Sequence, residues 1–253
     1  MKELRYIPVI EAPAHEQMAI DESLLRSYDD GDSLPTLRFF RFKPSAITVG
    51  YSQEIDKVID TEKCEGYDIP FVRRITGGGT VYHDYHGEIT YSIVTDQYDG
   101  SIQESFEYLL NPIIETLKEY GLNATFKPYN DILVSRRKVS GSAQRRGKKG
   151  LLQHGTLMYA TDLEILSDIL LLDEEKLKAK GVNSFFELVT TMEKELSTKP
   201  EPNELIGKMK NNYENYFGIQ VEKSELSEKE EKYVEELKEK YKSSEWTYNK
   251  NWK

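Results

Sequence analysis

The chain has 253 residues, 38% of them hydrophobic and 31% charged, which is typical of a soluble globular protein with a sizeable core. Its formal net charge of −10 disfavours general nucleic-acid binding, because neutralising phosphates requires clustered lysine and arginine. The single cysteine, Cys64, excludes an intramolecular disulfide, and the sequence has neither a CxxC motif nor a Cys/His cluster for a metal.

The N-terminal residues lack the basic region and long apolar run of a signal peptide. No stretch approaches the roughly 18 apolar residues that a membrane helix needs. We therefore expect a cytoplasmic protein that has neither a membrane nor a nucleic acid as partner.

The first half of the chain is predicted to begin with a helix and to continue mainly as strands. In residues 15–28, apolar and other side chains lie near helical spacing, at Met18, Asp21, Leu24, Leu25 and Tyr28. A second helix is predicted at 55–66, with Gly66 as its C-cap. Strands are predicted at 36–42, 46–51, 69–75, 80–83 and 88–94.

The second half alternates strands with longer helices. The helix predicted at 101–121 contains Pro112, which should kink or divide it. Short helices are expected around 162–180, and a charged surface helix at 227–243. The other predicted elements are strands at 124–128, 131–135, 138–143, 151–159 and 219–223 and a helix at 203–218. This mixed order predicts an α/β (α+β) domain with more than one sheet.

The run RRITGGGTVYHD, from Arg73 to Asp84, joins two predicted strands through three glycines. Glycines allow a ligand to approach the backbone, and their N–H groups can form a nest for an anion. The two arginines can add charge-assisted contacts to a phosphate. The pattern is neither the dinucleotide fingerprint nor a Walker loop. A simple glycine-rich hairpin is the alternative.

A second group of polar residues lies on neighbouring predicted strands. Asn130 and Asp131 open one strand, and a hairpin tip at 135–137 returns Lys138 antiparallel to Asp131. The carboxylate could hold Mg²⁺, and the lysine could stabilise charge on an acyl carbonyl and a phosphate. A solvated surface pair is the alternative, and His154 alone could be an ordinary core histidine.

Residues 135–150 contain seven basic residues and no acidic one, although the chain as a whole is acidic. The segment is either a solvated hairpin or an anion site. The sequence alone leaves both interpretations open.

The segments RRITGGGTVYHD, NDILV, KVSGSAQ and QHGTLMY occur in this order and resemble the biotin/lipoate ligase family, most closely lipoate–protein ligase A. The resemblance extends to 176–192 and 245–252. It implies a large mixed β-sheet and a smaller sheet flanked by helices, related to class II synthetases. Ligases of this family carry a C-terminal accessory domain. We therefore expect residues 1–253 to be a single catalytic domain whose accessory domain is a separate polypeptide.

The resemblance implies an ATP-dependent ligase that uses Mg²⁺. Lipoate would be activated to lipoyl-AMP and then transferred to a lysine of a lipoyl-acceptor domain, such as a 2-oxoacid dehydrogenase E2 or the glycine cleavage H protein. The catalytic residues would be Lys138 and Asp131, with Asp131 the candidate magnesium ligand. ATP would be bound by Arg74, Gly79, Thr80, Val81, Tyr82 and Lys138. Lipoate would be bound by Arg73, Gly77, Gly78, His83, Asn130, Ser142, Ala143 and His154.

Two alternatives remain at this point. An octanoyltransferase of lipoate biosynthesis moves an acyl group from a carrier without ATP, and related transferases use a cysteine nucleophile. Here Cys64 lies in a predicted helix away from Lys138, which disfavours that mechanism. The other alternative is a non-catalytic protein that binds lipoate or a nucleotide.

Overall fold

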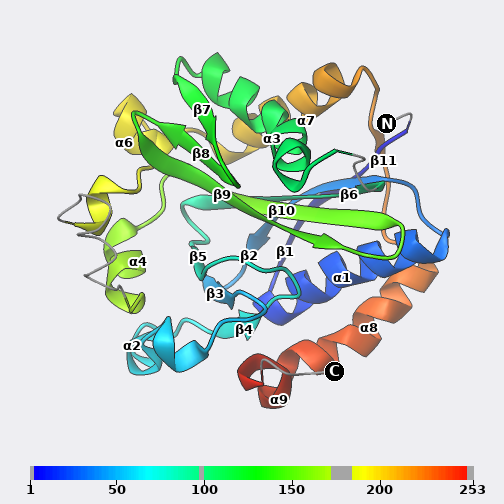
Figure 1. Cartoon of the computed structure of the whole chain (residues 1–253), viewed down its shortest axis with the longest axis horizontal. Helices are drawn as coiled ribbons and strands as arrows, with labels where there is room; N and C mark the ends of the chain where they lie inside the picture. The colour runs from blue at the N-terminus through cyan, green and yellow to red at the C-terminus, as the bar shows by residue number, and fades with distance from the viewer. Residues whose placement is uncertain (1–2, 97–99, 172–183, 250–253) are drawn as a thin grey trace.

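The structure, a computed structural model, describes residues 3–96, 100–171 and 184–249. It confirms the predicted fold class, because a large mixed sheet and a smaller sheet are flanked by helices (Figure 1). In the large sheet β1 is parallel to both of its neighbours, and the remaining pairs are antiparallel. Its order is β11 (Glu222–Lys223), β1 (Arg5–Ala12), β2 (Thr36–Phe42), β6 (Glu88–Asp96), β10 (Gly150–Met158), β9 (Arg137–Arg146), β8 (Asp131–Val134), β7 (Ala124–Lys127). The smaller sheet has the order β4 (Phe71–Arg73), β3 (Ala46–Val49), β5 (Val81–His83).

Strand β2 shows why the large sheet is covered on both faces. Successive side chains of a strand point to opposite faces. Leu37 and Phe39 pack into the core on one face, and Phe40 and Phe42 pack into the core on the other. A strand that is apolar on both faces has to lie between two layers of helices.

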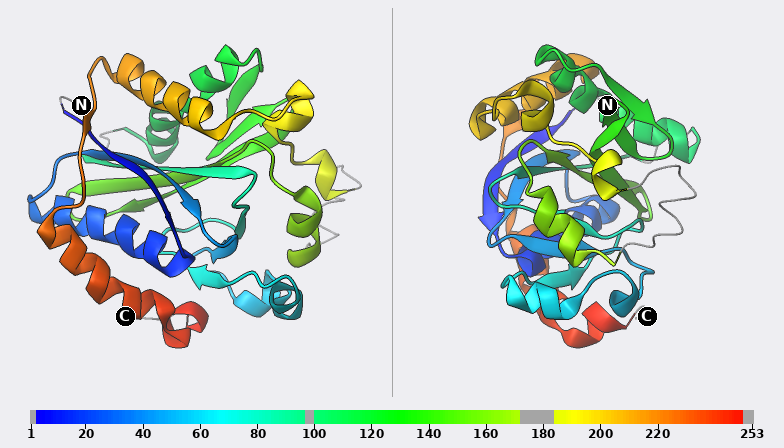
Figure 2. Two further views of the ribbon diagram at one scale, coloured as in Figure 1. Left: turned by 180° about the vertical axis from the view of Figure 1, so that it is seen from behind. Right: turned by 90° about the vertical axis from the view of Figure 1, so that its left-hand side faces the viewer.

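Helices α1 (Ala14–Asp30) and α8 (Glu228–Lys242) cover one face of the large sheet, whereas α3 (Ile102–Glu119) and α7 (Pro202–Phe217) cover the other (Figures 1 and 2). Shorter helices are α2 (Thr61–Gly66), α4 (Leu163–Ile169), α6 (Met192–Leu196), α9 (Ser244–Tyr248) and the 3-10 turns Ile55–Lys57 and Phe185–Glu187. In the described part of the chain, no helix combines the length and apolar character needed to cross a bilayer.

Several predicted elements differ from the structure. The prediction of a surface helix at 227–243 was wrong in one respect, because α8 buries Val234, Leu237 and Tyr241 in the core that it shares with α1. Helix α3 is not divided at Pro112, which is buried inside it. Packing against α7 compensates for the missing backbone hydrogen bond.

The predicted helix at 55–66 is two elements. Asp60 accepts a hydrogen bond from the Lys63 N–H and so starts α2, while Ile59 forms a β-bridge with Leu170. Strand β1 was not predicted, since its side chains do not alternate cleanly between polar and apolar. Residues 172–180 of the expected short helices, part of 176–192 and the end of 245–252 lie outside the described residues.

Candidate active site

An inner cavity of about 170 Å³ has walls from both sheets and from the helices beside them. Its apolar wall includes Met18, Phe42, Met158, Leu166 and Leu170. Most of the site residues predicted from the sequence also line it, namely Arg74, Gly78, Gly79, Thr80, Val81, Tyr82, His83, Asn130, Lys138, Ser142, Ala143 and His154. An apolar cavity with a few converging polar groups is the usual form of a small-molecule site.

An outer cavity of about 390 Å³ adjoins the inner one, and the two share Gly78, Asn130, Ser142 and Ala143 in their walls. Asn130 is tied to β9, because its side-chain amide donates to the Ser142 carbonyl and its own carbonyl accepts from the Ser142 N–H at 3.0 Å. The remaining wall of the outer cavity is formed by Gly77, Ile102, Phe106, Tyr129, Gln144 and Arg146. The site is therefore a narrow apolar chamber behind a wider, more polar entrance.

Lys138 projects from β9 beside the β8 strand that carries Asp131. The β8–β9 hairpin turns through Ser135 and Arg136, whose φ angles of 50° and 66° suit a tight hairpin turn. A register shift follows Ile132, yet the Lys138 ammonium reaches Asp131 Oδ1 at 2.7 Å. The predicted juxtaposition is therefore present. A side chain at Gly141 would lie 2.4 Å from Lys138 Nζ, so glycine makes room for the lysine.

Arg74 is buried, and burial lowers its pKa to about 10, so that it still carries a charge at neutral pH. A guanidinium has five N–H donors. Each has an oxygen partner here: Nε donates to Thr76 Oγ1 (2.9 Å), Nη1 to the carbonyl (3.0 Å) and hydroxyl (3.2 Å) of Thr48, and Nη2 to the carbonyls of Gly77 and Gly79 (2.7 Å each). Arg74 thus holds the glycine loop in shape, and no donor is left over for a phosphate.

Arg73 lies apart from both cavities. Its Nη1 donates to the carbonyls of Gly50, Tyr51 and Gln53, and its Nε donates to the carbonyl of Thr247 in α9. It joins the small sheet to the C-terminal helix and does not line either cavity. Neighbouring side chains in an extended segment point to opposite sides, which explains why Arg73 points away from the cavities while Arg74 points towards them.

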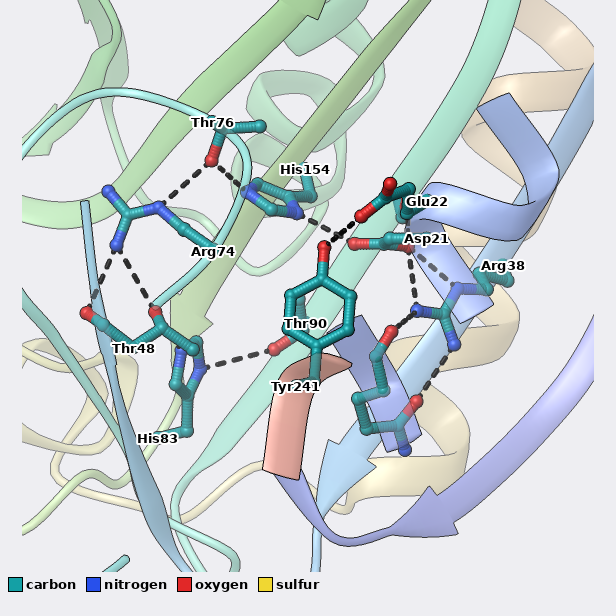
Figure 3. A network of polar contacts seen from close by, with 12 residues as sticks. Asp21, Glu22, Arg38, Thr48, Arg74, Thr76, His83, Thr90, His154 and Tyr241 are labelled. Atoms are coloured by element: carbon teal, nitrogen blue, oxygen red, sulfur yellow. Dashed lines mark hydrogen bonds and ion pairs between the residues drawn. The ribbon is translucent and has the colours of Figure 1, made fainter. Parts of the chain in front are cut away.

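A buried polar network continues from Arg74 to helix α1 (Figure 3). Thr76 Oγ1 lies 2.7 Å from His154 Nε2, and His154 Nδ1 lies 2.7 Å from Asp21 Oδ2. Burial alone would raise the pKa of Asp21, but Arg38 and His154 lower it to about 2. The ionised carboxylate accepts from His154 Nδ1–H, which leaves Nε2 to accept from the Thr76 hydroxyl. This network was not predicted from the sequence, although Asp21 among the apolar positions of a helix was a signal for it.

His83 has a different environment on the opposite wall. Its Nδ1 lies 3.2 Å from Glu88 Oε2, and its ring stacks on Phe42 with centroids 3.9 Å apart. Burial raises the pKa of Glu88 well above its usual value, and burial and the charge of Arg74 lower the pKa of His83 well below. The pair is therefore neutral, with the Glu88 carboxyl donating to His83 and His83 Nε2–H donating to Thr48 at 3.0 Å.

Replacing Thr76 by valine keeps its shape and removes the hydroxyl that links His154 to Arg74. We expect the free energy of unfolding to fall by about 1–3 kcal/mol, because buried donors and acceptors lose partners. The KM for the substrate that occupies the inner cavity should rise, because the glycine loop is held less firmly. Urea unfolding and steady-state kinetics measure the two effects. Thr116→Val is the control: its buried hydroxyl lies in α3, so it should affect stability but not KM. An unchanged KM in Thr76→Val would contradict the link.

Other residues with possible chemistry are placed as follows. Cys64 lies in α2, is 0% exposed, and lines neither cavity; burial raises the pKa of its thiol to about 11. Asp131 is already paired with Lys138, and within residues 3–96, 100–171 and 184–249 no cluster of three His, Cys, Asp or Glu side chains could hold a metal. The described residues therefore offer no site that holds Mg²⁺ by protein side chains alone.

The chain resembles enzymes of lipoylation. A relative from Clostridioides difficile (strain 630), named octanoyltransferase LipM, is 31% identical over 92% of this chain and 93% of its own. A bipartite lipoate protein ligase from Thermoplasma acidophilum, studied with its E2 lipoyl domain, is 28% identical, with a TM-score of 0.88 over 100% of this chain and 99% of that one. A lipoate-protein ligase A bound with ATP is 27% identical, with a TM-score of 0.84 over 97% and 98%.

The relatives correct the predicted activity. Further octanoyltransferases LipM match 92–99% of this chain at 28–30% identity, which contradicts the prediction of an ATP-dependent ligase and favours the alternative. The motifs that suggested a ligase lie around the two cavities, which a ligase and a transferase of this family would both need. They therefore establish the family without deciding how the acyl group is activated.

The family itself is established by a match over most of the chain. A family model described as the lipoyl protein ligase A/B catalytic domain covers residues 13–214. That match contains six of the eight strands of the large sheet, all the residues that line the two cavities, and the Lys138–Asp131 pair, whereas β1 and β11 lie outside it. The chain therefore belongs to the lipoyl protein ligase A/B catalytic domain family.

Proposed function

We propose that this protein transfers an octanoyl group from a carrier thioester to a lysine of a lipoyl domain, without ATP. The observation that carries the proposal is the Lys138 ammonium in the wall of the apolar inner cavity, paired with Asp131 at 2.7 Å. The names of the relatives support the octanoyl group. The E2 lipoyl domain studied with the archaeal neighbour supports the acceptor.

In this reaction the octanoyl chain occupies the inner cavity, with its carbonyl next to Lys138. The neutral amine of the acceptor lysine attacks the thioester carbonyl, forming a C–N bond. The oxygen becomes an oxyanion, which the Lys138 ammonium stabilises as the charge develops. The C–S bond then breaks, the amine loses its proton, and the carrier leaves as a thiol. Asp131 keeps the ammonium in place, and the proton that the amine loses ends on the sulfur of the departing carrier.

The glycine loop and the two histidines have supporting roles in this proposal. Gly78 and Gly79 let the acyl donor approach the backbone, and Arg74 fixes their conformation from behind. Thr80, Val81 and Tyr82 complete the wall on β5, and Ser142 and Ala143 form the wall on β9. His83 and His154 are neutral or carboxylate-paired groups that shape the cavity without adding net charge to it.

The proposal is tested by supplying two donors in separate reactions, an octanoyl carrier thioester alone and octanoate with ATP and Mg²⁺. Mass spectrometry of a lipoyl domain detects acylation, and a coupled assay detects pyrophosphate. We expect acylation from the thioester, with release of a free carrier thiol. Acylation only in the reaction with ATP, accompanied by pyrophosphate, would refute the proposal.

A direct transfer predicts little role for the thiol of Cys64. Cys64 is buried and lies outside both cavities, and the pKa of its thiol is raised. These three properties argue against a thiolate nucleophile. We expect Cys64→Ser to keep the transfer rate within a few-fold of the parent protein. Circular dichroism confirms that the variant is folded, and Cys64→Ala serves as a second, less polar replacement. Near-total loss of activity in both folded variants would show that the acyl group passes through an enzyme thioester.

A further inference from the structure

The seven basic residues of 135–150 do not form one patch. Arg136, Arg137 and Lys138 lie at one end of β9, and the other four lie around its opposite end, at the turn to β10. We call this second group the β9–β10 basic turn; it consists of Arg145, Arg146, Lys148 and Lys149. The antiparallel hairpin separates the two groups by most of a ten-residue strand.

Among the described residues, the four charged groups of the basic turn form no ion pair within 4.0 Å, although the charge of Lys148 acts on the carboxylates of Asp29 and Asp30. Asp29 is held by the backbone of the turn, since it accepts the N–H groups of Lys148, Lys149 and Gly150 at 2.8 Å each. Arg145, Lys148 and Lys149 are exposed. In a protein with a net charge of −10, four cations within five residues form a local positive field.

The basic turn adjoins the entrance of the site. Arg146 is half-buried, forms part of the wall of the outer cavity, and contacts Ser105 Oγ at 3.4 Å. The outer cavity meets the inner cavity at Gly78 and Ala143. Arg146 follows Gly141 by five residues, roughly 17 Å along an antiparallel strand. A donor whose thioester lies at Lys138 and whose arm runs through the adjoining outer cavity emerges beside Arg146 and the basic turn.

We propose that the β9–β10 basic turn is the docking site of an acidic acyl-carrier protein, whose prosthetic arm lies in the outer cavity with its phosphodiester at Arg146. The inference rests on the proposed function and adds to it the surface that receives the carrier. A phosphodiester and acidic side chains are the groups that arginine and lysine recognise through charge-assisted hydrogen bonds. The exposed cations attract the acidic carrier electrostatically, and Arg146 binds the phosphodiester and so fixes the position of the prosthetic arm.

The test compares a carrier-bound octanoyl donor with octanoyl-pantetheine, which has neither the protein nor the phosphate. The variant combines Arg145→Glu, Lys148→Glu and Lys149→Glu and leaves Arg146 in place. We expect its KM for the carrier donor to rise about tenfold or more, and to depend less on salt than that of the parent. The KM and kcat for octanoyl-pantetheine should not change. A matched control replaces the exposed Lys57, Lys118 and Lys223 by glutamate, which alters net charge equally at other surfaces.

Carrier binding measured by fluorescence anisotropy separates docking from catalysis. Carrier bound by the parent and the control but not by the variant supports the docking site, even if no acyl transfer occurs and the proposed function fails. Equal carrier affinity in all three proteins overturns the docking site while leaving the function intact. A variant that binds carrier normally but has a raised KM for the lipoyl domain overturns it as well, since the turn would then receive the acceptor.

Discussion

Replacing Lys138 by alanine is expected to lower the rate of acyl transfer by about 10²–10³ and to leave the fold intact. Among the residues that the structure describes, the Lys138 ammonium is the one cation that both lines the inner cavity and projects from a strand beside a carboxylate, Asp131 at 2.7 Å. Its side chain is 37% exposed, so truncation leaves no large buried cavity. Single-turnover kinetics with a lipoyl domain measure the loss in rate, and thermal unfolding checks the fold.

Two further variants sharpen this test. Lys138→Arg should also be slow, because a planar guanidinium cannot replace a compact ammonium in the space beside Gly141. Arg137→Ala is the matched control, since this neighbouring cation pairs with Glu195 at 2.6 Å and lines neither cavity. If Lys138→Ala retains a rate within a few-fold of the parent, the oxyanion is stabilised by another group.

Gly78→Val is expected to abolish binding of the acyl donor, with a smaller effect on stability. Gly78 has a φ of 90°, which β-branched residues rarely adopt, and a Cβ there would lie 3.2 Å from Arg74 Nη2 and 3.9 Å from the Ala143 Cβ. The added side chain would therefore stand in the opening shared by the two cavities and push against the arginine that holds the loop. Calorimetry with octanoyl-pantetheine measures the affinity.

The same substitution elsewhere provides the control. At Gly207 in α7 an added Cβ has nothing within 4 Å, so Gly207→Val should bind the donor like the parent protein. Urea unfolding of both variants separates a local effect on binding from a general loss of stability. Unchanged affinity in a folded Gly78→Val protein would show that the donor does not pass this glycine.

Much of the fold and part of the site follow from local patterns. Alternating apolar residues predicted most strands, and helical spacing predicted α1, α3 and α7. The hairpin tip brought Lys138 close to Asp131, although the irregular register pairs Asp131 with Gly141 and Lys138 with Leu133, so that the long lysine side chain completes the contact. The glycine run marked the loop that separates the two cavities.

Other features could not be predicted from the sequence, for physical reasons. Arg73 and Arg74 look equivalent in sequence, yet one anchors α9 and the other holds the glycine loop. Arg73 is the last residue of β4 and Arg74 follows it. Which of the two guanidinium groups faces the cavities therefore depends on which face of the small sheet packs against the large one. The charged pattern of α8 likewise concealed its buried stripe, since a helix can bury a narrow face while most of its residues remain polar.

The sequence by itself therefore determined the fold class, the family and the pairing of Lys138 with Asp131, because these depend on residues that are close along the chain or on motifs read in order. Only the tertiary structure decided that Asp21, His154, Thr76 and Arg74 form one network, since they come from α1, β10 and the glycine loop. The tertiary structure also places the basic residues of 135–150 in two groups at opposite ends of β9. Contacts between distant segments depend on how the layers pack, and side-chain patterns within one element do not encode which partner it meets.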